Sequence, residues 1–439
     1  MNKVLTHLRI LRPYSEPDYM ESGWIRLIDG RIAAFGEMPV VLEPEETEIN
    51  LAGKLVLPGM INAHTHLYSA LAMGMSPPSR TPTNFNQILE SVWWRLDRAL
   101  DEDSIRASFQ AGLLACLRAG VTTVFDHHSS PNWIKGSLKL LADIAREMGI
   151  KISLAYEVTD RNGADIFQDA LEENLDAMER YRDDPVVHPM LGLHASFTLS
   201  DESLETVRRA LDDFPETGIH IHLAEDITDH HDSGERGYQS VVQRLSEYDL
   251  IHSNSLYAHG IHITPDDADT LFNSNANLVH NPTSNANNRV GILNGVTLEL
   301  LGYGLGTDGM QANLLDEART GALIRSSKMT QGQPNVDYLK LLFENNPRIA
   351  SKLFGYHLSR IEPGVPADLV FYDYHARTEL SEMNWPAHLL YGLGQPDDVM
   401  TDGAFMIRNG DPVGIDEHEI LKNARITSGR LWKTIEALK

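Results

Sequence analysis

The middle of the chain alternates short apolar runs with longer amphipathic stretches, a pattern typical of repeated strand–helix units around a parallel sheet. In ADIFQDALEENLDAMERYR, Phe167, Leu171, Leu175 and Met178 recur at helical spacing and form one apolar face. Eight apolar runs fit the strand part: KLVLPGMINAHTH, VTTVFDHH, KISLAYEVTD, PMLGLHASFT, GIHIHLAED, SLYAHGIHI, ANLVHNP and GYGLGTDG. Most of them end near a His, Asp or Glu. We predict an α/β fold built on a (β/α)8 TIM-like barrel, in which such strand ends converge on one mouth.

The two ends of the chain follow a different pattern of short strand-like runs broken by turn signals. GWIRLIDGRIAAFGEMP lies near the start, and PADLVFYDY and VMTDGAFMIRNGDPV lie near the end, where Asp-Gly and Asn-Gly pairs favour tight turns. We predict that residues 1–57 and 355–439 together form a small β-sandwich subdomain. Residues 58–354 then form the barrel.

Charge and cysteine content narrow the classes of partner and cofactor. The 439 residues carry 37 Lys and Arg against 62 Asp and Glu, a net charge of −25 that would repel nucleic acid and anionic membranes. We therefore predict neither as a partner. The sequence shows no signal peptide and no apolar run of roughly 20 residues, so a cytoplasmic location is expected. Cys116 is the only cysteine, so any metal must be held by nitrogen and oxygen ligands.

Histidines stand near the ends of two apolar runs in positions suited to a metal. His64 and His66 lie two residues apart at a strand end, so both imidazoles point to the same side of the strand. His222 lies near the end of GIHIHLAED and is the better ligand candidate there. His220 shares its strand face and is expected one layer deeper in the barrel.

Two later runs also end in groups that bind metals. His259 lies in YAHG and Asp308 lies in GTDG. Three histidines and an aspartate at one mouth would hold a divalent ion, zinc by ligand type, and leave a position for water. Fe²⁺ and Mn²⁺ are the alternatives to zinc.

The order of these motifs resembles that of the amidohydrolase superfamily, and within it the branch of mononuclear-metal deaminases and chlorohydrolases. VLPGMINAHTH, HLAE, YAHG and GTDG occur in that order, and PADLVFYD is similar to the closing β-sandwich strand of those enzymes. The resemblance covers essentially the whole chain. WWRLDRALDE, DHHSSP and TDRNG are similar to segments of the aminohydrolases of the SsnA family.

The resemblance implies a metal site and two catalytic residues beside it. The implied metal ligands are His64, His66, His222 and Asp308. Glu225 is implied as the proton shuttle, and His259 as the residue that orients the attacking water. A second ion would need a bridging ligand, often a carboxylated lysine, and the end of PMLGLHASFT offers no lysine. We therefore expect one ion per chain, and by the same resemblance a homodimer.

These roles fit the hydrolytic deamination of a ring. A bound divalent ion lowers the pKa of water from 15.7 to roughly 7 and so supplies hydroxide at neutral pH. Asp308 can accept the proton of that water, His259 can steady it, and Glu225 can protonate a ring nitrogen beside the attacked carbon. The expected substrate is an aminated planar heterocycle, purine-like or pterin-like, and the product is ammonia. Hydrolysis of a cyclic amide and removal of chloride from a ring are the alternatives.

Other histidines at strand ends are candidates for contacts to the substrate. His194 in GLHASFT lies where relatives read His-Ala-Pro-Tyr-Thr, and a hydrogen-bonded structural histidine is the alternative. His127 and His128 are adjacent in a strand and so point opposite ways. The sequence does not decide which of them enters the mouth, and we name His128 as the candidate. His280 ends the ANLVHNP run, where many relatives have His-Cys-Pro.

Two adjacent tryptophans follow the first predicted strand. Trp93 and Trp94 could stack on a planar ring in the mouth of the barrel. Alternatively they lie on an amphipathic helix with Leu89, Val92 and Leu96 and pack against the barrel. Both interpretations stay open at this point.

Two other functions are weighed against hydrolysis. Gly304, Gly306 and Gly309 match the G-x-G-x-x-G fingerprint of dinucleotide-binding oxidoreductases, which also requires an acidic residue about 20 positions further on. Residues 318–336 contain no Asp or Glu, and the motif lies in the last strand–helix unit instead of the first. A barrel that has lost its activity is disfavoured as well, because every ligand position is filled.

Overall fold

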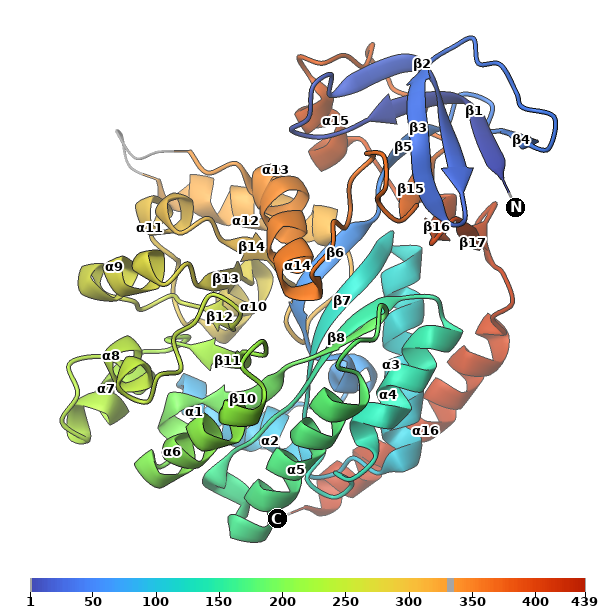
Figure 1. Cartoon of the computed structure of the whole chain (residues 1–439). Coiled ribbons are helices and arrows are strands. Elements are labelled where there is room, and N and C mark those ends of the chain that lie inside the picture. The colour runs from blue at the N-terminus through green and yellow to red at the C-terminus, as the bar shows by residue number, and fades with distance from the viewer. Residues whose placement is uncertain (1, 330–334, 439) are drawn as a thin grey trace.

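Parallel strands form the centre of the molecule, and helices surround them (Figure 1). The computed structural model describes residues 2–329 and 335–438. Each of the eight predicted runs contains a strand whose residues are all buried, as is typical of parallel strands covered on both faces. The strands are β6 (Met60–Thr65), β7 (Val121–His128), β8 (Lys151–Tyr156), β10 (Leu191–Ala195), β11 (Ile219–Leu223), β12 (Leu256–His259), β13 (Asn277–His280) and β14 (Gly304–Leu305).

The central strands belong to two parallel sheets. In the first sheet, β6, β7 and β8 are followed by the short strand β9 (Val187–Pro189), and β10 to β14 form the second. Isolated parallel bridges join the two sheets, because Thr65 pairs with Asp308 and Val158 pairs with Leu193. The carboxyl ends of the eight strands therefore lie on one side of the molecule.

Helices follow most of the central strands. The predicted helix is α5 (Ala164–Arg180), in which Phe167, Leu171 and Met178 are buried and Leu175 is partly buried, so that prediction is confirmed. The other helices of this region are α3 (Glu102–Arg118), α4 (Ser137–Glu147), α6 (Asp201–Ala210), α7 (Thr228–Glu235), α8 (Val241–Glu247), α9 (Pro265–Asn273), α10 (Pro282–Asn288), α11 (Gly295–Leu300), α12 (Leu314–Lys328), α13 (Tyr338–Lys340) and α14 (Asn346–Phe354).

Both ends of the chain contribute to one nine-stranded sheet, drawn at the top of Figure 1. Its order is β18 (Asp411–Pro412), β17 (Ala404–Arg408), β16 (Asp398–Thr401), β15 (Leu369–Tyr372), β5 (Leu55–Pro58), β1 (Lys3–Leu11), β2 (Tyr19–Ile28) and β3 (Arg31–Glu37), and β4 (Thr47–Asn50) pairs with β1. The first predicted run splits at Gly59 into β5 of this sheet and β6 of the centre. A Cβ at Gly59 would lie 2.4 Å from Thr122 Oγ1, so only glycine fits this crossing.

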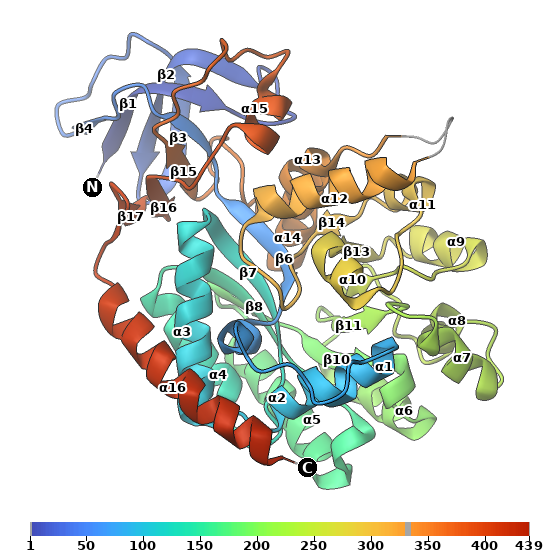
Figure 2. The same cartoon turned by 180° about the vertical axis from the view of Figure 1, so that it is seen from behind.

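A long C-terminal helix, which the sequence patterns above do not predict, packs against one of the helices that surround the central strands. α16 (Glu417–Ala437) contacts α3 and runs along it in Figure 2. The indole Nε1 of Trp432 in this helix donates to the carbonyl of Leu71 at 2.8 Å. Arg95 Nη2 donates to the carbonyl of Leu438, just after the helix, at 2.9 Å. The end of the chain therefore anchors the segment between β6 and α3, which consists of η1 (Leu67–Ala72), α1 (Phe85–Ile88), the π-helical turn η2 (Leu89–Trp93) and α2 (Trp94–Asp97).

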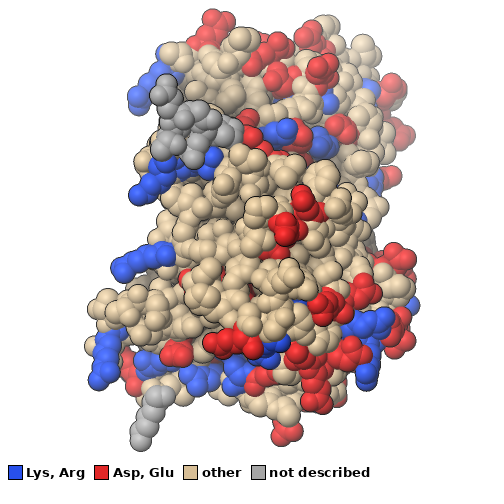
Figure 3. Space-filling model, turned by 90° about the vertical axis from the view of Figure 1, so that its left-hand side faces the viewer, with Lys and Arg blue, Asp and Glu red and all other residues tan. Residues whose placement is uncertain are grey.

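Charged side chains are mixed on the surface. On the face drawn in Figure 3, Lys and Arg side chains are interspersed with acidic ones and form no continuous basic area among the described residues. Among residues 2–329 and 335–438, every helix is too short or too polar to cross a membrane.

A buried ion cluster joins the nine-stranded sheet to the central strands. Lys151, the first residue of β8, lies 3.0 Å from Asp368 Oδ1 and 2.8 Å from Asp402 Oδ1. The Lys151 side chain is 3% exposed and that of Asp368 is 1% exposed. Burial disfavours the charged lysine, but the two carboxylates outweigh this effect and raise its pKa.

We expect Lys151→Met to lower the free energy of unfolding by about 3–5 kcal/mol, because it leaves the Asp368 carboxylate buried and unpaired. Chemical denaturation measures this loss. The matched control is Lys139→Met, which removes the exposed ion pair to Asp143 on α4 and should change stability little. Equal effects of the two substitutions would contradict a stabilising role for the buried cluster.

Candidate metal centre and active site

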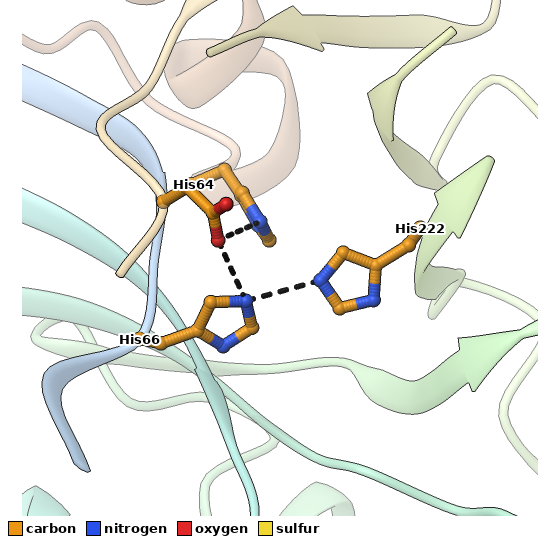
Figure 4. A group of neighbouring side chains, drawn as sticks. His64, His66 and His222 are labelled. Atoms are coloured by element: carbon orange, nitrogen blue, oxygen red, sulfur yellow. Dashed lines mark hydrogen bonds and ion pairs between the residues drawn. The ribbon is translucent and has the colours of Figure 1, made fainter. Parts of the chain in front are cut away.

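Four side chains converge where the central strands end. His64 and His66 extend from β6, His222 from β11 and Asp308 follows β14, and one ligand atom of each lies within 4.8 Å of the others. His66 Nε2 lies 3.0 Å from both His222 Nε2 and Asp308 Oδ1, and His64 Nε2 lies 3.6 Å from Asp308 Oδ1. Figure 4 shows the three imidazoles pointing toward one another. His64 Nε2 is buried without a hydrogen-bond partner, which fits a nitrogen that binds a cation.

Backbone carbonyls fix the tautomers of two of these imidazoles. His66 Nδ1 lies 2.6 Å from the carbonyl oxygen of His127, and His222 Nδ1 lies 2.7 Å from that of His194. A carbonyl oxygen only accepts, so each Nδ1 carries the proton and each Nε2 presents a lone pair. This arrangement is typical of metal-binding histidines, whose second nitrogen is held by a neighbouring acceptor.

His64 is held by a histidine behind it. His64 Nδ1 lies 2.9 Å from Nε2 of His220, which is fully buried. One nitrogen of this pair must donate to the other, so His220 positions the His64 ring without belonging to the group of four. Burial lowers the pKa of His220 well below its usual value, so this ring is neutral.

Asp308 is held rigidly and is ionised. Thr65 Oγ1 donates to its backbone carbonyl at 2.9 Å, and Ser284 Oγ donates to its Oδ2. Burial alone would raise the pKa of Asp308, but the close approach of the His64 and His66 imidazoles outweighs burial and holds the pKa well below its usual range. The carboxylate can therefore serve as a ligand or accept a proton.

His259 presents a different tautomer to the site. Asn285 Nδ2 donates to His259 Nδ1 at 2.7 Å, so the ring proton lies on Nε2. That Nε2 is 3.6 Å from Glu225 Oε2 and is buried without a hydrogen-bond partner. His259 can thus donate a hydrogen bond into the site, whereas the rings of His66 and His222 present lone pairs.

Glu225 is poised to act as an acid. Its side chain is 10% exposed, and its Oε1 accepts from Asn288 Nδ2 at 3.4 Å. Burial raises the pKa of Glu225 well above its usual value, and the negative charge of Asp308 adds to this effect. A glutamic acid whose pKa is raised beside a carboxylate suits general acid catalysis.

A cavity opens above these groups and has one aromatic and one charged wall. The apolar wall contains Phe85, Leu89, Trp93, Trp94 and Phe197. Trp93 and Trp94 also pack against the cluster formed by Phe85, Leu89 and Val290, and stacking of either ring on a substrate stays a prediction. The charged wall contains Asp97, Glu157 and Arg161. Such a mixture of aromatic and polar lining residues is typical of small-molecule sites.

The structure distinguishes the two adjacent histidines of β7. The His127 ring lies 5.4 Å from that of His66 and 4.8 Å from that of His222, measured between ring centroids. His128 points the other way, where its Nε2 lies 2.9 Å from Ser130 Oγ. Neither ring is part of the described cavity lining, so a substrate contact by His128 stays a prediction that its position does not support.

The two other histidines proposed to contact substrate differ in position. His194 lines the cavity, and its Nδ1 lies 2.9 Å from Thr198 Oγ1. His280 is 3% exposed, packs 6.1 Å from the Tyr338 ring and is absent from the described cavity lining. The position of His280 thus does not support a substrate contact, because the side chain is buried against Tyr338.

The charged wall was not found from the sequence. Glu157 and Arg161 follow β8, and they are polar residues after an apolar run, the same signal that marked His64 and His66. Asp97 lies in a helical turn and carries no comparable signal.

The chain belongs to the amidohydrolase family, which matches residues 55–406, so the predicted family is confirmed. It is 30% identical over 402 residues to 5-methylthioadenosine/S-adenosylhomocysteine deaminase 2 of Archaeoglobus fulgidus, covering 88% of this chain and 90% of that protein. It is 25% identical over 389 residues to 5'-deoxyadenosine deaminase of Methanococcus aeolicus, covering 86% of this chain and 87% of that protein. The finer resemblance to the SsnA family stays a prediction.

Solved structures share the fold. An adenosine deaminase from Xanthomonas campestris with bound zinc superposes with a TM-score of 0.84 at 20% identity, covering 98% of both chains. Guanine deaminase of E. coli superposes with a TM-score of 0.76 at 19% identity, covering 92% of this chain and 99% of that one. Family and fold together imply a TIM-barrel architecture for the central strands.

Proposed function

We propose that this protein is a metal-dependent hydrolase that deaminates an aminated planar heterocycle and releases ammonia. The observation that carries the proposal is that buried Glu225, whose pKa is raised, lies beside Asp308 and three converging imidazoles. The relatives named as deaminases of adenosine derivatives support the same reaction. A purine-like ring is therefore the first choice of substrate, ahead of a pterin.

We propose that His64, His66, His222 and Asp308 hold one divalent ion, zinc by ligand type. The orphaned His64 Nε2 and the carbonyl-fixed Nδ1 of His66 and His222 support this donor set. When bound, such an ion lowers the pKa of water to roughly 7, which supplies the nucleophile at neutral pH.

The residues of the chain then divide the proton transfers. Asp308 is ionised and accepts a proton from the attacking water. His259 donates a hydrogen bond from Nε2 to the attacking oxygen and holds it in line. Glu225 gives its proton to a ring nitrogen beside the attacked carbon, which makes that carbon more electrophilic. Asp308 then passes its proton to the amino group, which leaves as ammonia when the tetrahedral centre collapses. The proton of the new hydroxyl group returns to Glu225, so both carboxyl groups regain their starting states.

The architecture that we propose around this site follows the sequence prediction. Residues 58–354 would form a closed (β/α)8 barrel, which the isolated bridges between the two parallel sheets support. Residues 1–57 and 355–439 would form the β-sandwich subdomain. Within this range α16 packs on α3 of the central region and so would not be part of the sandwich. The homodimer and the cytoplasmic location stay predictions, and sedimentation of the purified protein tests the first of them.

A screen for ammonia release tests the proposed function. Zinc-loaded protein is incubated with adenosine derivatives, guanine, 8-oxoguanine, pterins and cytosine, and metal-stripped protein is the control. We expect ammonia from at least one purine, and only with metal present. Chloride release from a chlorinated ring or opening of a cyclic amide, without ammonia from any heterocycle, would replace the deaminase proposal by one of the two alternatives.

A further inference from the structure

The buried face of α10 is polar. Four side chains share this face at helical spacing, and they belong to Asn281, Ser284, Asn285 and Asn288. Each of the four residues is buried. A buried helix face ordinarily carries apolar side chains, and a buried amide or hydroxyl group costs free energy unless it is hydrogen-bonded. The polar face of α10 therefore requires partners, and the active site supplies them.

Three of these side chains donate to three groups of the proposed mechanism. The donor and acceptor atoms are Ser284 Oγ and Asp308 Oδ2, Asn285 Nδ2 and His259 Nδ1 at 2.7 Å, and Asn288 Nδ2 and Glu225 Oε1 at 3.4 Å. The acceptors lie at the ends of three different strands, β14, β12 and β11. One short helix thus fixes the spacing between groups that three separate strands carry.

A buried carboxyl group of another helix holds the start of α10. Glu317 of α12 is 0% exposed, and its Oε1 accepts from the backbone amide of Thr283 at 2.7 Å. Gln311 Nε2 donates to its Oε2 at 2.9 Å. Because Pro282 has no amide hydrogen, Thr283 is the first residue of α10 with a donor, and donors at a helix start have no partner within the helix. Among the described residues, Asn281 makes no side-chain capping bond, so Glu317 supplies the cap.

Glu317 can act on the reaction only through α10. It is absent from the described cavity lining, and the mechanism proposed above does not use it. Its helix α12 packs against α10, and the two lie next to each other in Figure 2. Ser284 and Asn285 directly follow the anchored Thr283, so loss of the anchor frees the part of α10 that holds Asp308 and His259. A displacement of about 1 Å at a reacting group can cost about 10²-fold in rate.

We propose that Glu317 is a positioning residue of the active site. It fixes the start of α10, and α10 fixes Asp308, His259 and Glu225 relative to one another. This inference rests on the proposed deaminase function, and it adds a residue that acts through a helix without touching the substrate.

The test compares Glu317→Met with Glu317→Gln in the zinc-loaded protein at pH 8. Burial raises the pKa of Glu317 to about 7, so the wild-type group is ionised at this pH. Methionine fills a similar volume but accepts hydrogen bonds only weakly. We expect it to lower kcat on the best substrate of the ammonia screen by about 10–100-fold, with KM within about 3-fold, because Glu317 does not line the cavity.

Glu317→Gln is the conservative variant and should rescue the rate. Glutamine keeps a carbonyl oxygen for the Thr283 amide, and Gln311 can turn its own amide over to accept from the new amino group. We expect kcat within about 3-fold of wild type. Glu299→Met, an exposed change on α11, is the matched control for Glu317→Met and should leave kcat unchanged.

A double variant separates positioning from a loss of folded protein. Asn285→Ala removes the contact through which α10 holds His259. If Glu317 acts through α10, Glu317→Met should lower kcat by a smaller factor in the Asn285→Ala protein than in the wild type. A general loss of structure would lower both by the same factor. Equal factors, or wild-type kcat in Glu317→Met, would overturn the inference.

Hydrogen exchange gives a readout that does not depend on activity. In zinc-loaded Glu317→Met, amides of peptides that cover residues 281–290 should exchange faster than in the wild type and in Glu317→Gln. If the wild type releases no ammonia, the proposed function fails; faster exchange then still supports the anchoring of α10, and unchanged exchange overturns it. Glu317→Asp, which withdraws the carboxyl group by one methylene, enters the same measurements if Glu317→Met does not fold.

Discussion

Glu225→Gln is expected to lower the rate of ammonia release by about 10²–10⁴-fold while the protein keeps its metal. Glutamine has nearly the same shape, and it can still accept the hydrogen bond from Asn288. It has no acidic proton to give to a ring nitrogen. The loss should therefore appear mainly in kcat, because binding of the ring depends on the cavity walls. Steady-state kinetics on the best substrate of the ammonia screen, with metal analysis of the same sample, measure both quantities.

Glu235→Gln supplies the comparison for this variant. Glu235 is an exposed residue at the end of α7, so its substitution makes the same change from a carboxyl group to an amide without touching the cavity. We expect wild-type activity from it. Undiminished ammonia release by Glu225→Gln would show that another group protonates the ring, and the proposed mechanism would then be wrong.

His64→Ala and His222→Ala are each expected to abolish stable metal binding and, with it, deamination. Each removes one of four donors and leaves the opposing carboxylate of Asp308 with fewer partners. Elemental analysis after dialysis should give about one ion per chain for the wild-type protein and far less for the variants. Because a ligand that binds only the folded state stabilises it, added zinc should raise the melting temperature of the wild-type protein alone.

His231→Ala is the control for these two variants. His231 is an exposed histidine of α7, so its loss removes an imidazole from the chain but not from the site. It should keep both the metal content and the thermal response to zinc. Metal content that stays at the wild-type level in His64→Ala and His222→Ala would contradict the proposed ligand set.

Much of the site follows from the periodicity of the strands. His64 and His66 share a strand face because side chains alternate with a period of two, and the fold brings both rings to one centre. Asp308 follows the last central strand, and parallel strands end on one side of the sheet. The motif order and its resemblance to the amidohydrolases added the roles of Glu225 and His259, which no periodicity implies.

Other features depend on contacts between segments far apart in the chain. Alternation shows that His127 and His128 point opposite ways, but the phase is set only when β7 pairs with β6 and β8. His280 is buried near Tyr338, which lies 58 residues further along the chain, and the apolar pattern of the strand does not predict this packing. Packing of α16 on α3 is likewise invisible in the local sequence.

The sequence by itself determined which residue types end the central strands, because strand alternation and turn preferences are local properties of the chain. It thereby determined the ligand candidates and the α/β architecture. Tertiary structure alone decided that Asp97, Glu157 and Arg161 form one buried cluster opposite the metal-binding group. The ionisation of Glu225 and Asp308 was decided in the same way, since burial and neighbouring charges set a pKa and both arise only when distant segments pack together.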